Sequence, residues 1–337
     1  MEHIVPLGLI HPPGHALPMD HILLLLPNGP GGKTKLKTDI RAPGIVRIFG
    51  IRSVIYKRDG VVESKIYSIA FTPCRELTFY FEAINDLSDS LHKEIELQKC
   101  EPNSQKEGNR EFLFCEYLVD YVTKAGEIIG TAGGLNGSNT LDWGSYDMRV
   151  PKLPFLGRGD EGPNNAVFYT TCPLNYYSSS LKDQLYDKLS DPDGQKRTAE
   201  PRCGEIMQDK FGTIQGNWQT KKEFRKDGDT TWSPFMGIGH DNYNASKGII
   251  GVAGTISNSG TINYEPEHNG TINRESSEVT ADGKIYCYQN NRRSNDDTAL
   301  SGRLLIQLLD PKTLKAEYQE KKCDEVFKFV SPTIYER

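Results

Sequence analysis

The stretch Val122–Asp147, VTKAGEIIGTAGGLNGSNTLDWGSYD, decides the fold that we expect for this chain. It begins with a turn at Ala125-Gly126, followed by a short apolar strand at Ile128-Ile129 and a glycine-rich turn. Its last segment, Leu141–Asp147, alternates in the way that a strand with one buried face does. The stretch therefore predicts short strands that are joined by tight turns.

Length, charge and hydropathy limit the class of protein. A chain of 337 residues predicts about two domains of ordinary soluble composition. The net charge is −5 and Lys and Arg are scattered, so we expect neither nucleic acid nor an anionic membrane surface as a partner. The apolar run Ile22–Leu26 is too short to span a bilayer and predicts a buried strand instead.

The N-terminus and the cysteines bear on the compartment. Met1–Ile4 lacks a basic start and prolines interrupt any apolar core, so no signal peptide is expected in this sequence. The protein is then cytoplasmic, or extracellular if a signal peptide was removed. Seven cysteines without a C-x-x-C pair argue against a structural metal cluster. They fit two or three disulfides plus one free thiol, or buried thiols in a reducing compartment.

Val122–Gly133 is similar to the pattern V-x-A-G-x-x-I-G-x-x-G of lysostaphin-type zinc endopeptidases, which cut peptidoglycan cross-links. The resemblance covers about residues 10–148. It implies a β-sandwich or barrel of the duplicated hybrid motif type, the fold that these enzymes share with biotinyl and lipoyl carrier domains. Residues 1–150 are therefore expected to form an endopeptidase-like β domain.

The same resemblance implies positions for a zinc centre. His15 and Asp20 resemble the first two ligands, which precede the segment Ala42–Ile48. Ala83 takes the place of a histidine that acts as general acid or base, and Asp142 stands where the last zinc-binding histidine of L-H-F-E belongs. One imidazole and two carboxylates bind zinc more weakly than a two-histidine set. The resemblance thus implies a fold that has kept its strands without its hydrolytic centre.

Two hypotheses of different class follow. The first is a pseudoenzyme, a non-catalytic binding or structural protein with no catalytic residue and no cofactor, whose ligand is a glycan or a cell-wall peptide. The second is a zinc hydrolase of peptide bonds whose ligands come from His11, His15, Asp20, His21 and Asp142. A structural alternative is that His15 and Asp20 only hold a surface loop through local hydrogen bonds.

A proline- and glycine-rich linker at 151–165 predicts the domain boundary, followed by a β-rich domain over 166–337. Within that domain the sequence predicts one helix near 175–190, because Leu181, Leu185 and Leu189 recur every four residues. Three apolar runs between turn residues predict antiparallel hairpins that close into a small barrel or sandwich: Gly248–Ile256, Lys284–Gln289 and Arg303–Leu309. In the first half, Lys93–Glu111 is expected to form an exposed hairpin or insertion loop.

One polar segment of the second half, Arg197–Trp218, offers a candidate ligand pocket. Arg202 and Gln208 would supply directional hydrogen bonds, and Trp218 a stacking face for a sugar or a similar ring. The hypothesis that we favour is a structural loop, in which Arg202 pairs with Glu200 or Glu205 and Cys203 is disulfide-bonded.

Overall fold

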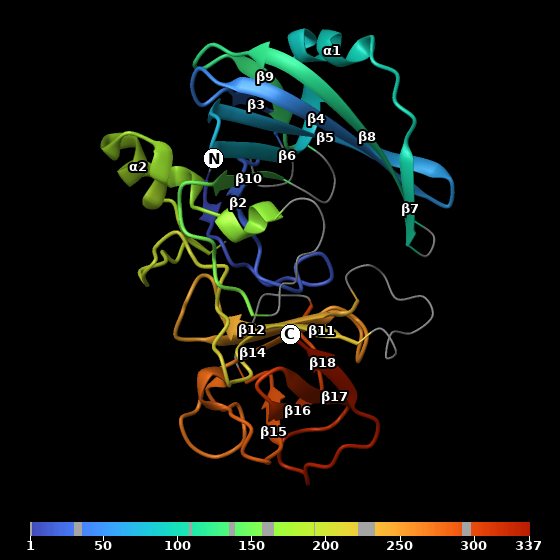
Figure 1. Ribbon diagram of the computed structural model, residues 1–337, viewed down its shortest axis with the longest axis vertical. Coiled ribbons are helices and arrows are strands. Elements are labelled where there is room, and N and C mark those ends of the chain that lie inside the picture. Colours follow the sequence, from blue (N-terminus) through green and yellow to red (C-terminus); the bar gives the residue numbers. More distant parts are fainter. Residues whose placement is uncertain are drawn as a thin grey trace. The chain divides into compact units, whose positions relative to one another are not determined.

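The computed structural model describes residues 2–29, 36–107, 110–134, 139–156, 165–191, 193–221, 233–291 and 298–337 (Figure 1). The chain is mainly β, as expected, and forms two compact units. The N-terminal unit contains residues 1–5, 21–152 and 169–196. The C-terminal unit contains residues 6–20, 153–168 and 197–337. No helix of the described residues is long and apolar enough to cross a membrane.

These units exchange segments, whereas the sequence suggested consecutive domains over 1–150 and 166–337 with a linker at 151–165. Leu7 donates its backbone N–H to Cys203 at 2.9 Å, which ties residues 6–20 to the C-terminal unit. Thr171 donates to Ser145 at 3.0 Å, which returns residues 169–196 to the N-terminal unit. Such long-range backbone bonds leave no periodic signal in the sequence. Residues 157–164 of the predicted linker lie outside the described residues.

The N-terminal unit is built on one antiparallel sheet in the order β1-β2-β10-β6-β5-β4-β8-β7, with β9 pairing both β3 and β6. Its strands are β1 (Ile4–Val5), β2 (His21–Leu25), β3 (Thr38–Arg41), β4 (Arg47–Arg58), β5 (Val61–Cys74), β6 (Leu77–Leu87), β7 (Asn103–Glu107), β8 (Arg110–Val122), β9 (Ile128–Ala132) and β10 (Thr140–Asp147). The apolar run Ile22–Leu26 and the segment Leu141–Asp147 are therefore strands, as predicted.

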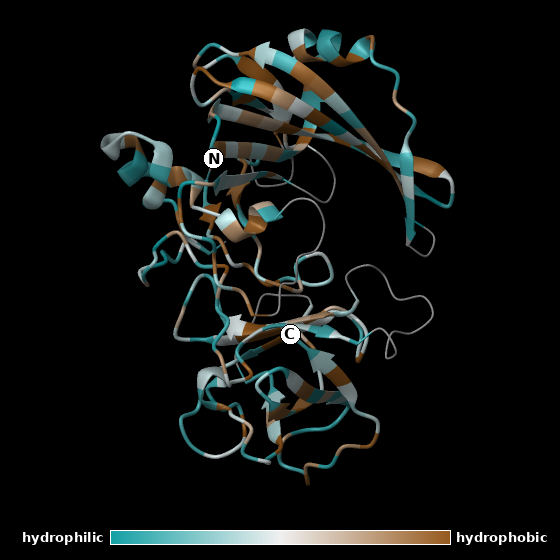
Figure 2. Cartoon of the chain, viewed as in Figure 1, coloured by the Kyte–Doolittle hydropathy of each residue, from teal (hydrophilic) through white to brown (hydrophobic). Residues whose placement is uncertain are grey.

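The two faces of this sheet differ in chemistry because successive side chains of a strand point to opposite sides. Figure 2 shows hydrophobic and hydrophilic residues alternating along its long strands. On one face, Phe81 packs against Phe71 and Trp143, with ring centroids 5.1 and 5.6 Å apart. On the other face, Glu82 lies directly opposite Asp142 of the neighbouring strand. We call this second side the polar face.

A helix that the sequence did not suggest, α1 (Asp89–Glu96), precedes the β7–β8 hairpin. The Ser88 hydroxyl caps the helix by accepting from the Leu91 N–H, and Leu91 and Ile95 are buried. The expectation for Lys93–Glu111 was thus right for the hairpin and wrong for its first residues. Two apolar residues among eight gave too short a periodic pattern to indicate a helix.

The helix expected near 175–190 exists but is shorter. α2 spans Ser179–Tyr186, follows the 3-10 helices η2 (Asn165–Tyr169) and η3 (Pro173–Tyr176), and belongs to the N-terminal unit. Leu181 is 40% exposed, so it does not form the apolar stripe on which the prediction rested. Leu189 is fully buried beyond the end of the helix, where Ile4 bridges to it.

The C-terminal unit is an eight-stranded antiparallel sheet that closes almost into a barrel, in the order β14-β13-β12-β11-β18-β17-β16-β15. Tyr264 and Tyr288 connect its two end strands, with ring centroids 5.1 Å apart. The elements are β11 (Gly216–Thr220), β12 (Phe235–His240), β13 (Gly248–Val252), β14 (Gly260–Tyr264), η5 (Ser276–Glu278), β15 (Tyr286–Gln289), β16 (Arg303–Asp310), β17 (Thr313–Gln319) and β18 (Thr333–Glu336). The three predicted apolar runs are β13, β15 and β16.

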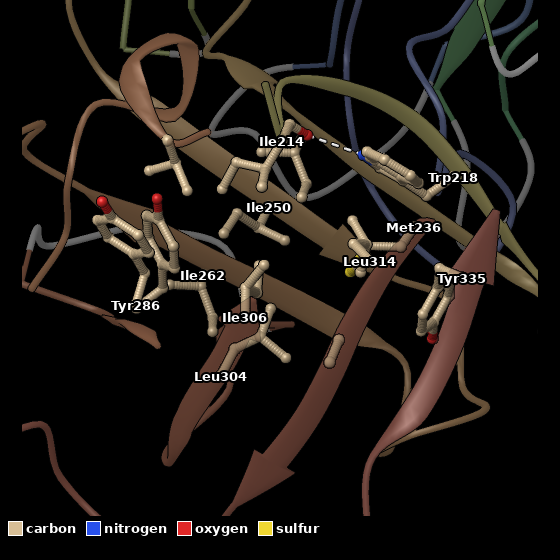
Figure 3. Packing of buried hydrophobic residues seen from close by; sticks show 14 of the residues in the cluster. Ile214, Trp218, Met236, Ile250, Ile262, Tyr286, Leu304, Ile306, Leu314 and Tyr335 are labelled. Atoms are coloured by element: carbon tan, nitrogen blue, oxygen red, sulfur yellow. Dashed lines mark hydrogen bonds between the residues drawn. The ribbon is translucent and has the colours of Figure 1, made fainter. Parts of the chain in front are cut away.

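Large apolar side chains fill the interior of this sheet (Figure 3). Trp218, Met236, Ile250, Leu304 and Tyr335 are each fully buried there. This burial supplies most of the stabilisation that a small β unit can obtain.

The cysteines follow the disulfide hypothesis. Cys100 is bonded to Cys115 and Cys287 to Cys323, and Cys172 and Cys203 are also disulfide-bonded. Cys74 is the free, exposed thiol. Disulfides of this number are typical of proteins that work in oxidising compartments.

Candidate functional site

The predicted zinc ligands are divided between the two units of the chain. His15 and Asp20 belong to the C-terminal unit, whereas Asp142 lies on β10 of the N-terminal unit. In the described part of the chain, no group of three or more His, Cys, Asp or Glu side chains could hold a metal ion. The backbones of His11 and His15 bond to each other, with N···O distances of 2.8 and 3.2 Å, as in a tight loop.

Asp142 instead lines a cavity of about 680 Å³ in the N-terminal unit, on the polar face of the sheet. We call this cavity the polar-face pocket. Ala83 lines the same pocket, although it lies far from Asp142 in the sequence. The strands β4, β5, β6, β8 and β10 and the ends of nearby turns supply its lining: Tyr56, Lys57, Arg58, Glu63, Ser64, Ile66, Ala83, Asn85, Arg110, Phe112, Gly134, Thr140 and Asp142.

A β-bulge in β6 shapes one wall of the pocket. Ile69 pairs with Phe81 and Tyr67 pairs with Ile84, so β6 carries one residue more than β5 over this interval. Ala83 takes up the irregularity with a φ of 61°, a left-handed conformation that is uncommon for a residue with a Cβ. The bulge turns both Glu82 and Ala83 toward the polar face.

Asp142 is the most strongly perturbed acid of the pocket. Its side chain is 21% exposed, and its Oδ2 lies 3.7 Å from His21 Nε2, which is too long for a hydrogen bond. Burial raises the pKa of Asp142 to about 6, and the charge of Glu82 adds to this effect. His21 and the Thr140 hydroxyl lower the pKa of the same carboxyl.

Tyr56 and Arg52 of β4 lie near this acid pair. Burial raises the pKa of Tyr56, and the charges of Glu82 and Asp142 raise it further while Arg52 lowers it. The Tyr56 hydroxyl therefore remains a hydrogen-bond donor at neutral pH. The Arg52 guanidinium lies 4.5 Å from the centre of the Phe114 ring.

The lining also includes basic side chains that are held in ion pairs, and two aromatic rings. Arg58 Nε binds Glu63 Oε1 at 2.8 Å, and Lys57 Nζ lies 3.5 Å from Glu111 Oε2. The rings of Tyr56 and Phe112 pack edge to face with centroids 5.3 Å apart. A cavity lined by the Asp142 carboxylate, aromatic rings and basic side chains can bind a polar ligand in a fixed orientation. Its described lining contains no histidine, so an imidazole acid or base is missing there.

The residues of the second predicted site, Arg202, Gln208 and Trp218, are engaged by contacts within the C-terminal unit. Trp218 is fully buried, donates Nε1–H to Ile214 O at 2.8 Å and is covered by the Arg337 guanidinium at 4.2 Å. The Gln208 carboxamide is engaged at both ends by the His240 backbone, at 3.3 and 2.7 Å. The backbone N–H of Arg202 donates to Glu200 Oε2 at 3.0 Å. These contacts and the disulfide-bonded Cys203 fit the structural loop.

Sequence reasoning missed Tyr56, Glu82 and Arg52. Each is a polar residue within a mostly apolar strand, such as Glu82 in Phe79–Ile84, and this pattern could have marked a buried polar face. The pairing of β6 with β10, which brings Glu82 to Asp142, cannot be deduced from either strand alone.

Comparison with known proteins identifies no relative, since no family model, no curated protein and no solved structure matches the chain.

Proposed function

We propose that this chain is a non-catalytic binding protein built on a degenerate endopeptidase-like domain, and that the polar-face pocket is its ligand site. The observation that carries the proposal is the position of Ala83 and Asp142. These are the residues at which the resemblance to lysostaphin-type endopeptidases places a general acid or base and a zinc ligand. Both line the same cavity, as the corresponding residues of a former active site would.

The chemistry of the lining supports binding rather than hydrolysis. A catalytic zinc site needs three protein ligands and an open position for water, and the described donors do not gather in such a group. The pocket is lined by aromatic rings, carboxylates and an amide, which are the groups that orient glycans and peptides. Its ligand in this proposal is a cell-wall peptide or glycan, which a disulfide-bonded protein would meet outside the cytoplasm.

The test is calorimetric titration of the intact protein with soluble peptidoglycan fragments, using glycan-only and peptide-only fragments separately. We expect saturable binding that weakens about tenfold in Phe112→Ala, because the ring lines the pocket. Phe211→Ala is the control, since Phe211 is exposed in the other unit. Equal loss in both variants, or no binding of any fragment, contradicts the proposal.

A zinc hydrolase is the alternative that the same protein samples can test. It requires about one zinc per chain after zinc loading, fragment cleavage that a chelator stops, and loss of both in His15→Ala.

A further inference from the structure

The acidic end of the polar-face pocket consists of Asp142, which lines the pocket, and Glu82, which lies beside it on the same face of the sheet, and it constrains the charge of the ligand. Asp142 and Glu82 are directly opposite each other on β10 and β6 and share one face of the sheet. We propose that the ligand carries an organic ammonium group and that the Asp142 carboxylate binds it. This inference rests on the proposed function, because it assumes that the pocket is the ligand site.

In the part of the chain that the structure describes, neither Asp142 nor Glu82 forms an ion pair with a Lys or Arg side chain. His21 Nε2 lies 3.7 Å from Asp142 Oδ2. Glu82 Oε1 accepts a hydrogen bond from the Ser68 hydroxyl at 3.3 Å. Two adjacent carboxylates that are partly removed from water repel each other, and a cation between them relieves this repulsion.

Groups from three strands act on the charge of Asp142. These groups are His21 of β2, Thr140 of β10 itself and Glu82 of β6. Arg52 of β4 acts on the pKa of Tyr56, which Asp142 and Glu82 also affect. Arg52 is directed to the Phe114 ring and forms no ion pair with either acid. The acidic end therefore retains an excess of negative charge when both carboxyls are ionised.

The rest of the lining favours an organic cation over a bare ion. The rings of Tyr56 and Phe112 offer aromatic faces, which attract ammonium groups within about 6 Å. Lys57, Arg58 and Arg110 lie on the hairpin ends of β4 and β8, away from Asp142, and repel an ammonium there. Attraction at one end and repulsion at the other would fix the orientation of the bound ligand.

The test is an NMR titration of the full chain with three probes of equal length: hexylammonium, hexanol and hexanoate. At pH 7.5 we expect hexylammonium to bind at least tenfold more tightly than either of the others. Asp142→Asn should abolish this preference and Glu82→Gln should reduce it. Asp120→Asn should not change it, because Asp120 is an exposed carboxylate that pairs with Arg47 outside the pocket.

The preference for hexylammonium should also weaken as the pH falls from 7.5 to 5, because Asp142 becomes protonated in this interval. Equal affinity for hexanol and hexylammonium, or an unchanged preference in Asp142→Asn, overturns the inference. If peptidoglycan fragments still bind in a Phe112-dependent way, the proposed function survives that result. If neither the probes nor the fragments bind, both fail.

Discussion

Asp142 and Asp147 lie on the same strand, yet their surroundings act on them in opposite directions. Arg149 holds Asp147 with two bonds of 2.7 Å, and the Tyr176 hydroxyl adds a third, so the pKa of Asp147 lies far below its usual range. Burial raises the pKa of Asp142 to about 6, and the neighbouring carboxylate of Glu82 contributes to this shift. The first carboxylate has the partners of a structural anchor. Asp142 lacks these partners, and carboxylates with a perturbed pKa are frequent at sites that act on ligands.

At the same scale, Asp142→Asn should stabilise the protein at alkaline pH. A raised pKa means that the folded chain binds this proton more tightly than the unfolded chain, so stability is lost as the pH rises from about 4 to above 6. The lost stability amounts to about 3 kcal/mol, from a shift of about two pKa units. Urea unfolding should therefore show Asp142→Asn gaining up to this amount at pH 8 and nothing near pH 4. A loss of stability at pH 8 would refute this account of Asp142.

The elements differ in how much of their structure could be predicted from the sequence. β2, β13, β15 and β16 follow from apolar runs, because a short apolar run between turn residues favours a buried strand. The polar face could not be predicted in this way. Its chemistry depends on the bulge at Ala83 and on the pairing of β6 with β10, which are properties of the sheet and not of one strand.

The pairing of β6 and β10 also predicts the effect of a small substitution. A Cβ added at Gly144 would lie 2.2 Å from the Tyr80 ring, which covers this glycine across the two strands. Gly144→Ala should cost about 1–3 kcal/mol in unfolding free energy, because the ring must move away from its contact with His21. Thermal unfolding measures the change. Gly44→Ala, where nothing lies within 4 Å, is the matched control and should remain close to wild type.

For the whole molecule, the division into two units was visible in the length, but the exchange of segments between them was not. The sequence left the disulfides open because counting cysteines does not give their pairing. The predicted metal centre depended on a resemblance in local motifs. The fold placed two of its residues in one unit and the third in the other.

The two disulfides within the units should respond differently to a reductant under native conditions. Cys287 and Cys323 are almost fully buried, whereas Cys100 and Cys115 are half-buried at the β7–β8 hairpin. Dithiothreitol should therefore reduce the Cys100–Cys115 bond first, as alkylation and peptide mapping would report. Removing the Cys287–Cys323 bond, which closes a loop of 36 residues in sequence separation, should cost about 4 kcal/mol. Earlier reduction of the buried bond would contradict the burial seen in the structure.

The central claim is that the pocket around Asp142 and Ala83 binds its ligand without cleaving it. The most direct measurement is to load the protein with zinc, titrate it with peptidoglycan fragments and identify the recovered fragments by mass spectrometry. We predict saturable binding that depends on Phe112, and fragments that are recovered intact. Cleaved fragments, with zinc bound in stoichiometric amount, would contradict it.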